Sequence, residues 1–143
     1  MPADLFHVVV EGDELERLLR RAGRSVEDLS STMAVVAEDL VAAAVDNIDT
    51  RGQGTWEPNK PSTIAKKGSD QPMVDDGVLL GSIRPDSGPD WAMASTNVDY
   101  IVYSLDGGDI IPKRNPFEVG DDVIEEASRF IAEAVADLIV RAA

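Results

Sequence analysis

The apolar positions of the chain repeat with two different periods, and these periods outline its first elements. A β-rich run over 5–11 predicts a strand that ends before a glycine. Apolar positions then recur every three or four residues, which predicts a short helix over 13–22, ended by Gly23, and a long helix over 26–48. The long helix would have roughly 20 residues and a length of about 30 Å.

Polar residues at the helix ends support these boundaries. Asp13 and Ser25 stand where N-caps are expected. The long helix closes with Asp46, Asn47 and Asp49, and negative charge at this end opposes the helix dipole. We therefore expect tertiary contacts to fix the end of the long helix.

The segment 50–72 interrupts the helical pattern and is predicted to be a long loop. It holds three Pro, three Gly, and four basic residues against two acidic ones, with room for one helical turn over 62–67. Loops longer than about 15 residues are usually functional or disordered in isolation. Trp56 argues against a plain linker, because a docked indole has a large apolar contact area.

Short apolar segments follow the loop and predict a small sheet. Residues 77–84 fit a helical turn that passes into a strand, 85–89 a turn, and 91–96 the second strand of a hairpin. The segment 99–105 fits either a strand or a short helix, and 106–109 fits a turn.

A further strand over 116–119 and a final helix complete the pattern. Asp121 or Asp122 is expected to cap this helix. Its buried face is predicted to consist of Val123, Ala127, Ile131, Ala134, Val135, Leu138 and Ile139. The order of elements predicts an α+β fold in one domain, 1–143, in which a small antiparallel sheet packs against the long helix and the C-terminal helix, and 50–72 is an extended interaction loop.

Composition limits the classes of function. The 143 residues suit one domain with a real core, and with 5% aromatic residues that core must consist mainly of aliphatic side chains. The absence of Cys excludes disulfides, Cys-ligated zinc and thiol catalysis. The net charge of −14 opposes non-specific binding to DNA and anionic membranes. It fits simple solubility, or a surface that must lie near DNA without binding it.

One short segment has the opposite charge. Arg17, Arg20, Arg21 and Arg24 share one face of the first predicted helix. This face is either solvated, with weak intramolecular ion pairs, or a contact to an acidic neighbour.

No constellation for catalysis was found. His7 is the only histidine, no glycine cluster precedes a helix start that would hold a phosphate, and the acidic pairs fit turn or cap chemistry. We therefore predict no enzyme, cofactor or metal site. The start lacks the features of a secretory signal and no apolar run approaches about 20 residues, so we expect a soluble protein made in a cytoplasm.

Four short motifs follow one another between Trp56 and Phe117. In order, they consist of Trp56, Pro58, Thr63 and Lys66 or Lys67; Met73, Gly77, Leu79 and Ser82; Tyr100 and Gly107; and Ile111, Pro112, Lys113, Arg114, Pro116 and Phe117. With the flanking strand and helices, this series resembles the Mu-type phage virion morphogenesis family of tail-completion proteins over almost the whole chain. Departures at Asp76, Ile101, Ser104 and Asn115 leave open which relative in that group it resembles.

The resemblance implies a structural protein of the virion. Such proteins form rings, commonly hexameric, in the neck or at the top of the tail, where they join the head connector or stopper to the tail tube or its terminator. Genomic DNA would pass through the lumen without specific binding, and no membrane would be involved. The chain would be made in the host bacterial cytoplasm and located in the virion.

Under this interpretation the central stretch contacts neighbouring subunits. The expected interface residues are Trp56, Pro58, Lys60, Lys66, Lys67, Tyr100, Tyr103, Arg114 and Phe117. For Tyr100 and Phe117 an ordinary core position is the competing interpretation. Two alternatives to a joining ring stay open: a tail terminator ring that caps tail-tube polymerisation, and a small acidic monomeric module that sequesters a host protein.

Overall fold

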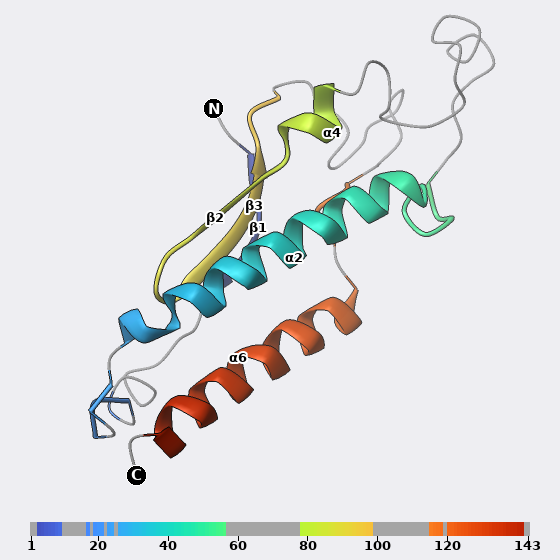
Figure 1. Ribbon diagram of the computed structural model, residues 1–143. Coiled ribbons are helices and arrows are strands. Elements are labelled where there is room, and N and C mark those ends of the chain that lie inside the picture. The colour runs from blue at the N-terminus through green and yellow to red at the C-terminus, as the bar shows by residue number, and fades with distance from the viewer. Residues whose placement is uncertain are drawn as a thin grey trace, which may run out of the picture.

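Helices and a small antiparallel sheet form an α+β fold, as the two periods predicted (Figure 1). The computed structural model describes residues 3–9, 17, 19–21, 23–24, 26–56, 78–98, 115–118 and 120–141. Its elements are β1 (Ala3–Val9), η1 (Val26–Leu29), α2 (Ser30–Asp49), α4 (Val78–Ser82), β2 (Arg84–Ser87), β3 (Trp91–Thr96) and α6 (Asp121–Arg141).

The layers follow the order sheet, α2, α6. The three-stranded sheet has the order β1-β3-β2, and both of its ladders are antiparallel. Helix α2 contacts β2 and β3 on one side and α6 on the other, so the long helix is the centre of the molecule (Figure 1). The C-terminal helix therefore joins the core through α2.

The central strand β3 explains how close the helix lies to the sheet. Buried and half-buried positions alternate along it, and the buried ones are Ala92, Ala94 and Thr96. Two of these side chains are single methyl groups, which allow a helix to approach the sheet closely. The alternation of large and small residues predicted this strand and its hairpin correctly.

The predicted turn over 85–89 is wrong in position. Strand β2 continues through Pro85 to Ser87, and Gly88 donates its backbone N–H to the Trp91 carbonyl to form the turn. Proline is tolerated here because β2 is an edge strand, where a missing N–H removes no ladder hydrogen bond.

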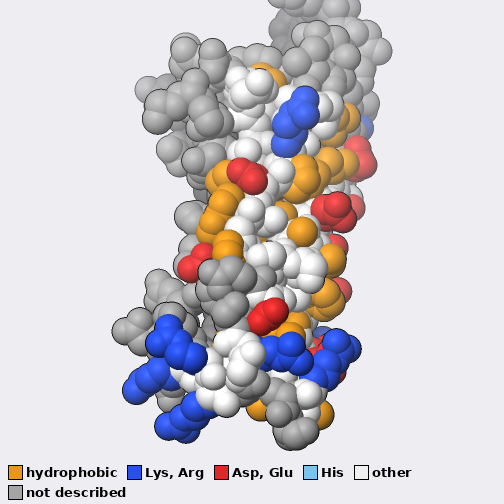
Figure 2. Space-filling model, turned by 60° about the vertical axis from the view of Figure 1, so that its left-hand side comes forward, with side chains coloured by type: hydrophobic (Ala, Val, Ile, Leu, Met, Phe, Trp, Pro, Cys, Tyr) orange, Lys and Arg blue, Asp and Glu red, His pale blue; other side chains and the backbone are white. Residues whose placement is uncertain are grey.

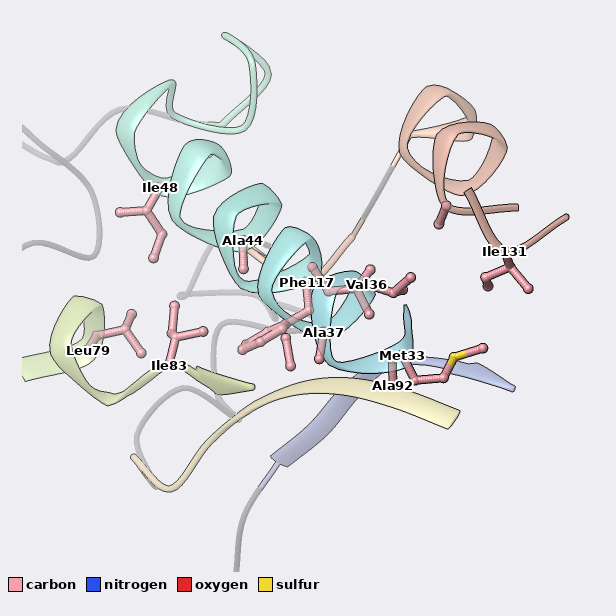
Figure 3. Packing of buried hydrophobic residues seen from close by; sticks show 13 residues of the cluster. Met33, Val36, Ala37, Ala44, Ile48, Leu79, Ile83, Ala92, Phe117 and Ile131 are labelled. Atoms are coloured by element: carbon pink, nitrogen blue, oxygen red, sulfur yellow. The ribbon is translucent and has the colours of Figure 1, made fainter. Parts of the chain in front are cut away.

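The core lies where α2 meets its two neighbours (Figure 3). Met33, Val36 and Leu40 come from the predicted stripe of α2, and Leu79 and Ile83 come from the segment around α4. From α6, Ala127 and Ile131 are buried, whereas Val123, Ala134, Val135, Leu138 and Ile139 are half-buried. The predicted face of α6 is thus correct in direction but only partly covered by described residues.

Three predicted details at segment ends need correction or completion. Helix α6 begins at Asp121, so Asp121 and Asp122 lie in its first turn rather than at its cap position. The long helix begins as the 3₁₀ turn η1, with α2 proper starting at Ser30. Gly23 ends the short helix as expected: its φ is +73°, and it donates to the Arg20 carbonyl while Arg24 donates to that of Leu19.

The predicted strand over 116–119 is a turn in its described part. Asn115 Oδ1 accepts a hydrogen bond from the Phe117 backbone N–H at 2.9 Å, and the Glu118 N–H donates to the Asn115 carbonyl. This Asx turn, with Pro116 inside it, outweighs the apolar character of the segment. The predictions for 57–72, 99–105 and 106–109 lie outside the described residues. No helix that the structure describes is long and apolar enough to cross a bilayer.

Candidate functional site

The two ends of the motif series meet at the C-terminal end of α2. Residues 50–56 form the turn that follows α2, and 115–118 return to the same place before α6. The connection between them is Asn47, which lies in the last turns of α2 and is 6% exposed. Its Nδ2 donates to the Pro116 carbonyl at 2.8 Å and to the Glu118 carbonyl at 3.0 Å. A tertiary contact thus fixes this helix end, as the opposed dipole predicted.

The backbone adopts a left-handed conformation in the turn after α2. Arg51 donates its N–H to the Ile48 carbonyl and Gly52 to that of Asn47, which is the Schellman pattern of a helix C-terminus. Four successive residues, 51–54, have φ values between +57° and +83°. Left-handed backbone costs about 1 kcal/mol or more for a residue with a Cβ, and two of the four are glycines.

Trp56 packs over this turn. A Cβ on Gly52 would overlap the Trp56 indole, so the ring covers the glycine directly. The backbone N–H of Trp56 donates to the Arg51 carbonyl at 3.0 Å, and the half-buried side chain of Trp56 packs against the core cluster. The turn thereby sets both the position and the direction of the chain at the start of the loop.

A polar hollow of about 230 Å³ opens between the two segments. Its lining consists of Asn47, Gly52, Gln53, Thr55, Trp56, Asn115, Glu118 and Gly120. These side chains supply amides, one hydroxyl, one carboxylate and an indole, and none is a strong nucleophile beside a base. Among the residues the structure describes, no group of His, Cys, Asp and Glu side chains could hold a metal ion.

The predicted interface residues have different outcomes. Trp56 is half-buried over the turn, and part of its indole lines the hollow. Phe117 is 3% exposed in the core cluster, so it follows the core interpretation and does not present a surface to a neighbour. Outside the described residues lie Pro58, Lys60, Lys66, Lys67, Tyr100, Tyr103 and Arg114.

Asn47 and Gly52 were not predicted as site residues. The sequence pattern could have identified Asn47, because it stands three residues after Ala44 and seven after Leu40 on the apolar stripe of α2. A polar side chain on such a stripe needs a buried partner. Gly52 had no signal of its own, since its role depends on where Trp56 lies.

Comparison with known proteins identified no relative. A scan against models of protein families, a search of curated proteins and a search of solved structures each returned no match.

Proposed function

We propose that this chain is a structural protein of a phage virion, which forms a ring in the neck or at the top of the tail and joins the head connector to the tail tube. The proposal starts from the ordered motifs between Trp56 and Phe117. The observation that carries it is that residues from three of the four motifs meet in one core cluster around α2. Trp56 packs against the core cluster, and Leu79 and Phe117 are members of it.

This convergence gives the motif series a physical reason. Ser82, from the second motif, is buried, and its hydroxyl lies 2.6 Å from that of Thr96 on β3. Pro116, from the fourth motif, accepts the buried hydrogen bond from Asn47. The spacing of the motif residues along the chain therefore follows from their packing in one core. Such a core can serve as the rigid body from which subunits assemble.

The position of the turn also supports a docking role for the loop. Trp56 and Asn115 line the same hollow, so the segments that follow Trp56 and precede Asn115 connect to the body at one end of α2. Lys60 lies four residues beyond Trp56 in the sequence, and Arg114 directly precedes Asn115. We expect this end of the molecule to contact an acidic neighbouring subunit.

A phage genome in which this chain is interrupted early tests the proposal. Loss of a joining ring should give filled heads and tails of normal length that fail to join, counted by electron microscopy of the lysate. Overlong tails would instead indicate the tail terminator. Normal infectious particles would reject both ring functions and favour the monomeric binding module, which also predicts that Trp56→Ala leaves particle assembly unchanged.

A further inference from the structure

A groove runs between α2 and α6, away from the hollow beside Trp56. It has a volume of about 280 Å³ and a lining of Val36, Asp39, Leu40, Ala42, Ala43, Asp46, Val123, Glu126 and Ala127. The floor is apolar and the carboxylates of Asp39, Asp46 and Glu126 are exposed at its rim. The small side chains of Ala42 and Ala43 make the groove possible, because larger ones would fill the space between the helices.

Two exposed apolar side chains stand one helical turn beyond residues of the groove lining, toward the start of α2. The two helices are antiparallel, so Val35, one turn before Asp39, and Phe130, one turn after Glu126, lie toward the same end (Figure 1). Both remain accessible, Val35 at 43% and Phe130 at 38%. An apolar strip with an acidic rim is suited to a partner that presents cationic groups on long aliphatic stems.

The same chain has such a surface at a different place. Arg17, Arg20 and Arg21 are exposed, Arg24 is half-buried, and the segment 17–24 contains no acidic residue. Figure 2 shows basic side chains gathered at one end of the molecule, and Figure 1 shows the segment beside the start of α2.

The basic segment and the groove are separated along the long axis of the molecule. From Leu29 at the beginning of α2 to the rim carboxylates of Asp39 and Asp46, the helical rise corresponds to about 15–25 Å.

We propose that the groove between α2 and α6 binds the basic segment 17–24 of a second copy of this chain. Guanidinium groups would pair with Asp39, Asp46 and Glu126, and an arginine stem would cover Val35 and Phe130, where an aromatic face also attracts a cation. The contact joins two different surfaces, so it is heterologous and generates a closed ring when the rotation between copies permits. The inference rests on the proposed function for the ring, while the contact itself is testable on the purified protein.

Because the chain contains no cysteine, single introduced cysteines give a clean test. Arg21→Cys and Ala42→Cys proteins are mixed and treated with a short bis-maleimide, and the dimer is measured on a denaturing gel. We expect a crosslinked dimer from the mixture and little from either variant alone. Ala132→Cys, at an exposed position of α6 outside the groove, replaces Ala42→Cys in the control mixture.

The crosslinking has outcomes that would overturn the inference. A mixture with Ala42→Cys that yields no more dimer than the mixture with Ala132→Cys contradicts it. So does strong dimer formation by Ala42→Cys alone, because that result would place groove against groove. Crosslinking as expected in a protein absent from virions would leave the contact standing and reject the proposed function, so the two failures are distinguishable.

Charge reversal tests the electrostatic part independently of crosslinking. Arg21→Glu should weaken self-association by roughly tenfold in sedimentation equilibrium, because attraction to the rim becomes repulsion. Mixing Arg21→Glu with Asp46→Arg should restore association. The control Arg129→Glu makes the same charge change at an exposed position outside the groove lining and should have little effect. Equal losses for Arg21→Glu and Arg129→Glu, or monomeric wild-type protein, would contradict the inference.

Discussion

Asn47 is predicted to be the most important polar side chain for the stability of the end of α2. Asn47→Ala removes two hydrogen bonds, of 2.8 and 3.0 Å, to the carbonyls of Pro116 and Glu118. Each bond contributes about 1 kcal/mol, and a buried carbonyl left without a donor adds about 1–2 kcal/mol. The better helix propensity of alanine returns about 0.5 kcal/mol. The free energy of unfolding should therefore fall by about 2.5–3.5 kcal/mol.

Urea denaturation followed by far-UV circular dichroism measures this loss. The urea midpoint should fall while the dependence of the unfolding free energy on urea stays unchanged, and the thermal midpoint should fall by roughly 8–12 °C for a domain of this size. Asn47→Asp should lose more, because it keeps the shape but turns a carboxylate oxygen toward two carbonyl oxygens.

A matched control lies two residues further along the same helix. Asp49 is exposed and is in the last turn of α2, where a negative charge opposes the dipole. Asp49→Ala should leave stability unchanged or raise it by about 0.5 kcal/mol. The reasoning is refuted if Asn47→Ala resembles Asp49→Ala, since the two buried hydrogen bonds would then contribute nothing measurable.

The remaining predictions concern the turn after α2 and the pair of buried hydroxyls of Ser82 and Thr96. Gly52→Ala should cost more than Gly54→Ala in urea denaturation: both residues have positive φ, but only at Gly52 would the Cβ meet the Trp56 indole, whereas Gly54 faces open space. The difference between the two should be at least about 1 kcal/mol, with a change in tryptophan fluorescence for Gly52→Ala alone. Thr96→Val should cost about 1–3 kcal/mol, because it removes the 2.6 Å hydrogen bond to the buried Ser82 hydroxyl and the acceptor of the Val98 backbone N–H. A double-mutant cycle with Ser82→Ala should show a coupling of at least about 0.5 kcal/mol, and additive losses would argue against the hydroxyl pair.

The sequence predicts the framework because local pattern and burial agree there. The apolar stripe of α2 keeps a helical spacing over 20 residues. Along β3, large and small residues alternate, so that the small ones lie on the side that a helix can cover. The misplaced segments contain proline. Pro85 lies in an edge strand and Pro116 in an Asx turn, and neither placement can be recognised before the sheet order and the role of Asn115 are known.

The candidate site was less predictable because it depends on contacts between distant segments. Asn47 is 69 residues from Pro116 in the sequence, and its polar character on an apolar stripe is the signal that could have identified it. Arg51 adopts a left-handed conformation that glycine usually provides, so nothing in its residue type marks the end of α2. The groove requires the relative placement of α2 and α6, which no local pattern contains.

The position of this chain in the virion tests the central claim most directly. An electron cryomicroscopy map of purified phage particles, with this chain fitted into density, should place copies of it in a ring around the DNA channel between the head connector and the tail tube. In that ring, segment 17–24 of each copy should face the groove between α2 and α6 of the next. Particles in which every neck and tail ring is accounted for by other chains, with this one absent by mass spectrometry, would contradict the account.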